Sequence, residues 1–313
     1  MYKLPCWRLA VMAVLGLVSV TALAQETIVV QDKAITQCDA SDSLASIEPN
    51  QPLVLIVHGC FASAQQFKAL AGVYEHLGVQ TACFEYDDRR GLDAVANELV
   101  QSINRLSPIL DEQRLTVIAH SQGGLIARKA HAQVADRAEN IDHNNIELVT
   151  ISSPFNGIEA SSHCGIGWLR VASLGIVDGI CYLVTGAKYL DIPPQADFIN
   201  QPEPLITQLQ RHLLIKTDET ETCRTRNSQG QCVKDDYVFS LQEQTQSKVD
   251  DSQVSTPLVV HAGHAEIVGS ESVVPWKLIE VLQQQKVMPE PKEGERATFT
   301  SMVEAIYLNY PLG

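Results

Sequence analysis

Positive charge is scarce in this sequence of 313 residues, which has 23 Lys and Arg against 37 Asp and Glu, for a net charge of −14. No basic cluster interrupts the excess of acid. A chain this acidic repels the phosphate backbone of nucleic acids, so we expect no nucleic-acid partner. The charge leaves a neutral ester or a lipid surface open as a partner.

The sequence also lacks an apolar run long enough for a membrane span. Residues 9–20 form an apolar run of 12 residues, whereas a helix that crosses a bilayer needs about 20. A basic head with Lys3 and Arg8 precedes this run, and the small residues Ala22 and Ala24 follow it. This layout predicts a signal peptide at residues 1–24, cleaved after Ala24, and export to the periplasm or the medium.

A Cys-x-x-Cys spacing is absent, so no metal site is expected from the cysteines. Cys223 and Cys232 bracket a polar segment with a turn sequence, which predicts a disulfide, and Cys164 with Cys181 is a second predicted pair. Loss of Cys6 with the signal peptide leaves seven cysteines, so at least one thiol is free or pairs between chains. The remaining pairing is open among Cys38, Cys60 and Cys83, with Cys60–Cys83 as one option.

From residue 52 onward, buried strand patterns alternate with helical patterns. Strands are expected at residues 53–57, 79–86, 115–119, 146–152, 213–216 and 258–261, and helices at 63–77, 92–106, 123–138 and 273–285. Such alternation predicts an α/β fold with a mostly parallel sheet covered by helices on both faces. In these sheets the ligand crevice lies beyond the carboxyl ends of the strands, so chemistry is expected there.

Two segments depart from the alternation. Residues 157–201 form a long insertion rich in glycine and apolar side chains, and residues 286–313 form a tail. We expect the insertion to be a cap over the crevice, with a small second core as the alternative. The Ser152-Ser153-Pro154 segment just before the insertion receives no catalytic role.

The segment Ala119-His120-Ser121-Gln122-Gly123 lies between a predicted strand and a predicted helix. Small residues two positions before and after Ser121 allow a sharp turn that exposes its hydroxyl. The turn places the N–H of Gln122 at a helix start, where it can hold an oxyanion. We therefore expect Ser121 to be a nucleophile.

With three further motifs, this segment resembles the α/β-hydrolase fold lipases and esterases, particularly secreted bacterial lipases with an Ala-His-Ser-x-Gly turn. The other motifs are His58-Gly59-Cys60, Asp235-Asp236-Tyr237-Val238 and Gly263-His264. The resemblance spans about residues 52–285 and implies an α/β-hydrolase domain over residues 25–285. It also implies ester hydrolysis without a cofactor. Ala119 stands where the family usually has glycine, a departure of one methyl group.

The resemblance implies roles for Cys60, for His264 and for an acidic residue. The backbone amide of Cys60 would be the second oxyanion donor, and its side chain is unrestricted because the donor is backbone. His264, just ahead of the last predicted helix, would be the base. An imidazole suits this role because its ordinary pKa lies near neutrality. His261, at the end of the preceding strand, is the alternative, with a core role as its simpler explanation.

The acid of the triad must lie between nucleophile and histidine in chain order. The resemblance favours Asp235, because related lipases have Asp-x-apolar-Val at this place. Asp236 is a close competitor, and Asp218 and Glu219, directly after the strand at 213–216, are a third option.

Together these features predict a secreted lipase or esterase that acts on a small-molecule or lipid ester through an acyl-enzyme. The apolar insertion suits a lid that makes transient contact with a lipid interface. An acyltransferase or phospholipase-type enzyme on the same triad, and a binding protein with an inactive site, remain alternatives.

Overall fold

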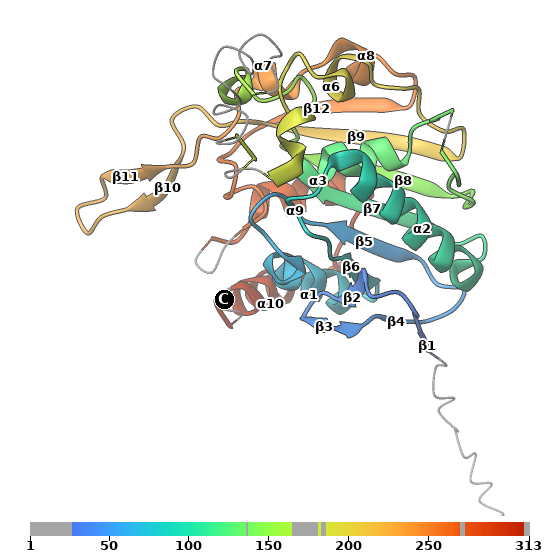
Figure 1. Ribbon diagram of the computed structural model, residues 1–313. Coiled ribbons are helices and arrows are strands. Elements are labelled where there is room, and N and C mark those ends of the chain that lie inside the picture. The colour runs from blue at the N-terminus through green and yellow to red at the C-terminus, as the bar shows by residue number, and fades with distance from the viewer. Residues whose placement is uncertain (1–26, 136, 165–180, 183–185, 270–272, 310–313) are drawn as a thin grey trace, which may run out of the picture.

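The computed structural model describes residues 27–135, 137–164, 181–182, 186–269 and 273–309 (Figure 1). The predicted signal peptide at residues 1–24 lies outside the described residues, as does part of the predicted cap at 157–201. No helix in the described ranges combines the length and apolarity needed to cross a bilayer.

An eight-stranded sheet organises the molecule, with strand order β12-β9-β8-β7-β5-β6-β2-β3. Its six strands from β12 to β6 are parallel, and β2 and β3 add an antiparallel edge. The strands are β2 (Ile35–Gln37), β3 (Ala40–Leu44), β5 (Leu53–Val57), β6 (Gln80–Phe84), β7 (Leu115–His120), β8 (Ile146–Ile151), β9 (Leu209–Asp218) and β12 (Ser255–His261). The predicted α/β fold with a mostly parallel sheet is confirmed.

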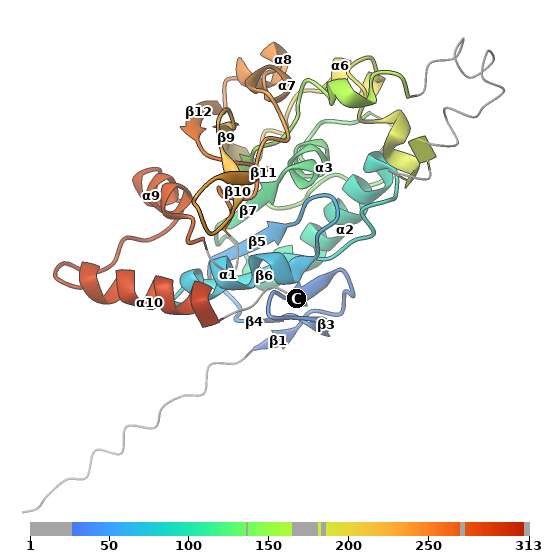
Figure 2. The same ribbon diagram turned by 90° about the vertical axis from the view of Figure 1, so that its left-hand side faces the viewer.

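Helices cover both faces of this sheet (Figure 2). Helices α2 (Leu92–Leu110) and α3 (Gln122–Ala130) contribute to one apolar core. On the other face, α1 (Lys68–His76), α9 (Trp276–Gln284) and α10 (Arg296–Asn309) contribute to a second core. Every residue of β5, β7 and β8 is buried between these layers, which explains their continuous aliphatic sequences.

Shorter elements complete the described chain. They are β1 (Ile28–Val29), β4 (Ser46–Ile47), η1 (Ala64–Phe67), η2 (Glu159–Ser161), η3 (Gly186–Leu190), α6 (Asp197–Asn200), β10 (Cys223–Arg226), β11 (Cys232–Asp235), α7 (Leu241–Gln244) and α8 (Ser247–Asp250). The β10–β11 hairpin projects from the body of the molecule (Figure 1).

One expected helix is shorter than predicted, and the tail contains a helix that was not predicted. The helix expected at 123–138 ends at Ala130, and the guanidinium of Arg137 donates hydrogen bonds to the carbonyls of Lys129, Ala130 and Ala132. Arg137 thus satisfies carbonyls that a longer helix would have used. The tail at 286–313 contains α10, which contributes Phe299, Val303 and Tyr307 to the core around α1 and α9.

Three disulfides join cysteines of the described chain. Cys164–Cys181 and Cys223–Cys232 form as predicted. The suggested pairing of Cys60 with Cys83 is wrong, because Cys83 on β6 is bonded to Cys38 beside β2. Cys60 keeps a free thiol.

The Cys38–Cys83 disulfide should contribute more to stability than Cys223–Cys232. The two bonds close loops with sequence separations of 45 and 9 residues, and chain entropy scales with loop length, giving about 4 and about 2.5 kcal/mol respectively. Replacing each pair by alanines and measuring unfolding in guanidinium chloride tests this order. A greater loss from the Cys223–Cys232 pair would contradict it.

Candidate active site

Ser121 occupies the turn between β7 and α3, with φ 56° and ψ −126°. Its neighbours approach closely, because a Cβ on Gly123 would lie 2.3 Å from the carbonyl oxygen of His58. A Cβ on Gly124 would lie 1.9 Å from Oγ of Ser153. The strained backbone and the two glycines therefore explain the small-residue pattern around Ser121.

His264 lies in the loop after β12 and faces Ser121. Its Nε2 is 3.2 Å from Oγ of Ser121, although the two residues are 143 positions apart in sequence. Both residues are largely buried, at 6% and 8% exposure. The ring of Phe239 meets the imidazole edge to face at 4.9 Å between centroids. The structure thus brings together the two residues that were predicted from the sequence to be nucleophile and base.

Glu219 holds the other side of the imidazole. It follows the last residue of β9, is 1% exposed, and places Oε1 3.0 Å from Nδ1 of His264. Its Oε2 accepts hydrogen bonds from the backbone amides of Val238 and Phe239. Burial raises the pKa of Glu219, but the hydrogen bonds from His264 and from these amides outweigh burial, so its pKa lies below the ordinary 4.5. Glu219 is therefore a carboxylate at neutral pH.

Two hydroxyls support the contact between Glu219 and His264. Oγ of Ser152 donates to Oε1 of Glu219 at 2.8 Å and lies 2.8 Å from Nδ1 of His264. Oγ1 of Thr217 lies 2.8 Å from the same carboxylate oxygen and 2.7 Å from Oγ of Ser152. Neither role was predicted from the sequence, in which Ser152 was given no catalytic role and Thr217 was not singled out. Their positions at the carboxyl ends of β8 and β9 were the available signal.

Asp235 does not reach His264, which corrects the expectation that it is the partner of this histidine. It is exposed at the end of β11, because the chain between Glu219 and Asp236 leaves the sheet as the projecting hairpin (Figure 1). Of the two residues in the third option, Glu219 is the one that contacts His264. The carboxylate of Asp218 instead accepts a hydrogen bond from the hydroxyl of Thr220. His261, expected in a core, has a largely exposed side chain.

Asp236 is buried, but its carboxylate bonds to groups other than the imidazole of His264. Its carboxylate accepts hydrogen bonds from the backbone amides of Ala265 and Glu266, directly after His264. The guanidinium of Arg224 donates to the same carboxylate at 2.7 and 2.8 Å. Asp236 thus fixes the turn that carries His264, without contacting the imidazole through its own side chain.

The backbone amides of Cys60 and Gln122 lie on the two segments next to Ser121, namely the loop after β5 and the start of α3. Gln122 is the first residue of α3, where helical N–H groups have no partner within the helix. Cys60 follows Gly59, on which a Cβ would lie 3.0 Å from Cβ of Ser121. This packing sets the loop after β5 directly against the turn at Ser121.

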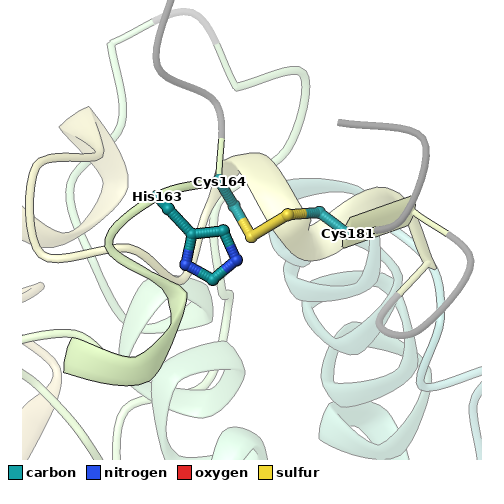
Figure 3. Close-up of side chains that lie close together, drawn as sticks. All are labelled: His163, Cys164 and Cys181. Carbon is teal, nitrogen blue, oxygen red and sulfur yellow. A yellow bond between two sulfur atoms is a disulfide. The ribbon is translucent and has the colours of Figure 1, made fainter. Parts of the chain in front are cut away.

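A cavity of about 1050 Å³ opens at this site. Ser121 and His264 line it together with the apolar residues Phe61, Leu125, Ile158, Ile192, Val238 and Phe239. Its wall also includes His163 and the Cys164–Cys181 disulfide. Figure 3 shows the histidine beside the joined sulfur atoms. Because both sulfurs are in the disulfide, this cluster offers one free ligand atom, which is too few to hold a metal.

Comparisons with known proteins agree with this architecture. Residues 48–178, less than half of the chain, match the model of a family described as "Putative serine esterase (DUF676)". The mature form of Bacillus licheniformis lipase BlEst2 is similar over 77% of this chain and 93% of that chain, with 12% identity and a TM-score of 0.52. Its propeptide form is similar over 78% of this chain and 51% of that chain, with 13% identity and a TM-score of 0.55. The chain has the α/β-hydrolase fold. A comparison with curated proteins finds no match.

The match to the esterase family covers only part of the hydrolase-fold site. Residues 48–178 include Cys60, Ser121 and Gln122, but Glu219 and His264 lie beyond them. The contact between Glu219 and His264 is therefore seen in the geometry of this chain and not in the family match.

Replacing Glu219 by glutamine should make the free energy of unfolding fall less as pH is lowered. Because the pKa of Glu219 is lowered by folding, its charge stabilises the native state above the unfolded pKa, and this contribution is lost as pH falls through the folded pKa. The difference in unfolding free energy between wild type and Glu219→Gln should therefore shrink as pH falls below about 4.5. Urea unfolding from pH 5 to pH 3 measures it. A difference that grows on acidification would contradict the lowered pKa.

Proposed function

We propose that this protein is an exported serine hydrolase that cleaves carboxylic esters, with Ser121 as nucleophile, His264 as base and Glu219 as the acid. The observation that carries the proposal is the continuous contact from Oγ of Ser121 through His264 to a buried carboxylate. Such a constellation is recognised by geometry and roles, and glutamate is an established variant of the acid in this fold.

The proposed reaction follows from these contacts. Nε2 of His264 accepts the proton of Ser121 as the serine oxygen attacks the ester carbonyl. Glu219 holds the Nδ1–H tautomer, which leaves Nε2 free to accept that proton, and it stabilises the imidazolium that forms. The amides of Cys60 and Gln122 donate to the oxyanion, His264 protonates the departing alcohol, and water then releases the acyl group.

An ester with a long acyl chain is the substrate class that we favour. The cavity of about 1050 Å³ has mainly apolar walls. Exposed apolar residues lie at or next to lining residues, with Phe61 at 77% exposure and also Tyr182, Tyr237 and Val238. Large exposed apolar surface suits transient contact with a lipid interface, so we propose a lipase. The three disulfides favour an oxidising compartment, which supports the proposed export.

Ser121→Ala should abolish ester hydrolysis and labelling by a fluorophosphonate probe, because both require the serine oxygen. Wild type should be labelled at Ser121, as mapped by peptide mass spectrometry. Retention of wild-type turnover in the folded Ser121→Ala variant would refute the proposed nucleophile.

Glu219→Gln should lower kcat by about 10³- to 10⁴-fold, because an amide favours the wrong tautomer of His264. Asp235→Asn is the matched control, since this carboxylate is exposed on the hairpin, and its kcat should stay within about twofold of wild type. Steady-state hydrolysis of a p-nitrophenyl ester measures both. If Asp235→Asn were the inactive variant, the proposed acid would be wrong.

Acyl-chain preference tests the substrate class. Rates on p-nitrophenyl esters should rise from acetate to longer acyl chains, because each buried methylene adds about 0.8 kcal/mol of binding free energy. Emulsified triglyceride should also be hydrolysed. Preference for acetate, with no activity on the emulsion, would identify a short-chain esterase.

A further inference from the structure

Lys188 is a buried cation beside the proposed site. It lies on η3, within the insertion expected as a cap, and is 2% exposed. Its Nζ donates to Oε1 of Gln122 at 2.6 Å, to the carbonyl of Asp88 at 2.7 Å and to Sγ of Cys60 at 2.9 Å. A buried ammonium is costly unless such acceptors satisfy it.

These contacts converge on the two residues whose amides flank Ser121. The side chains of Cys60 and Gln122 both contact Nζ of Lys188, although Cys60 lies in the loop after β5 and Gln122 begins α3. The carboxylate of Asp88, 3.4 Å from Nζ, accepts the backbone N–H of Phe61, the residue after Cys60. Lys188 therefore links the loop after β5 to the first residue of α3.

Two groups that contact Lys188, the thiol of Cys60 and the carboxylate of Asp88, have pKa values shifted by their surroundings. Burial raises the pKa of the Cys60 thiol, with the hydrogen bond from Lys188 opposing it, so Cys60 is an uncharged thiol at neutral pH. Burial raises the pKa of Asp88, but the Phe61 amide and Lys188 outweigh burial and leave its pKa below the ordinary value. The groups that contact Lys188 are thus one carboxylate and several uncharged acceptors.

The segment that carries Lys188 is attached to the body at two further points. The amide of Ala187 donates to the carbonyl of Arg89 at 2.7 Å, and Oδ2 of Asp191 accepts the amide of Leu92 at 2.8 Å. Gly186 has φ 76°, and a Cβ there would lie 2.3 Å from the carbonyl oxygen of Arg89. This attachment fixes where the ammonium enters the site.

We propose that Lys188 is a positioning residue that sets the distance between the two oxyanion-binding amides. The inference rests on the proposed function. Donors stabilise an oxyanion only when they lie within about 2.7–3.1 Å of the position that it will occupy. By bonding the side chains of Cys60 and Gln122 together, Lys188 keeps both amides in place before substrate arrives. An oxyanion hole held in this way depends on the docked end of the insertion.

Lys188→Met tests the proposal, because methionine keeps most of the apolar stem and removes the ammonium. We expect kcat to fall about 10²-fold and KM to change little, since the hole acts on the transition state. Affinity for an alkyl boronic acid, whose adduct with Ser121 is tetrahedral and anionic, should fall in proportion to kcat. A variant that was merely less stable would keep kcat per folded molecule, with the folded fraction measured by circular dichroism, and would keep its boronate affinity.

Lys129→Met is the matched control. Lys129 is also a largely buried lysine, with Nζ 2.6 Å from Glu203 and 3.3 Å from Asp93, and it is not among the residues that line the cavity. This variant should lose stability and keep kcat and boronate affinity. If Lys188→Met behaved like Lys129→Met, the positioning role would be overturned.

Gln122→Met supplies the same test through a second residue, because it removes the shortest contact of Lys188 and keeps the backbone amide. Its kcat should also fall with little change in KM. The double variant Lys188→Met/Gln122→Met should have a kcat no lower than that of the less active single variant, because both substitutions remove the same contact. Unchanged kcat in Gln122→Met, or in a folded Lys188→Met, would refute the inference while wild type remains active. Failure of wild type to react with a fluorophosphonate would instead refute the proposed function.

Discussion

The contact between the buried carboxylate of Glu219 and Nδ1 of His264 is the interaction on which the proposed chemistry depends. A buried carboxylate is tolerated only when donors surround it, and here two backbone amides and the hydroxyls of Ser152 and Thr217 do so. Because these groups satisfy the charge, it remains at neutral pH and orients the imidazole. The opposite nitrogen then points at Ser121.

The parallel sheet explains why these residues meet. Cys60, Ser121, Ser152, Glu219 and His264 each follow the carboxyl end of a different strand, namely β5, β7, β8, β9 and β12. Parallel neighbours place these ends at one edge, which is where ligands bind in wound α/β folds. The sheet therefore assembles groups from residue 60 to residue 264 of the sequence, and Lys188 from the insertion adds a further support.

The features that were predictable from sequence are those with local causes. The buried strands, the turn at Ser121 and the disulfide at Cys223–Cys232 follow from short-range patterns, and all three were expected. Glu219, the proposed acid, was named only within the third option, because its role depends on burial between Val238, Phe239 and His264, which no local pattern encodes. The same reason applies to Ser152, and to the tail, whose helix α10 packs on the core.

Nitrogen-15 NMR of the histidine rings tests the central contact most directly, with His264 assigned by its loss in His264→Asn. At neutral pH we expect His264 to be the Nδ1–H tautomer, with its Nδ1 proton shifted strongly downfield by Glu219 and this signal lost in Glu219→Gln. An Nε2–H tautomer, or a downfield proton that persists in Glu219→Gln, would contradict the account.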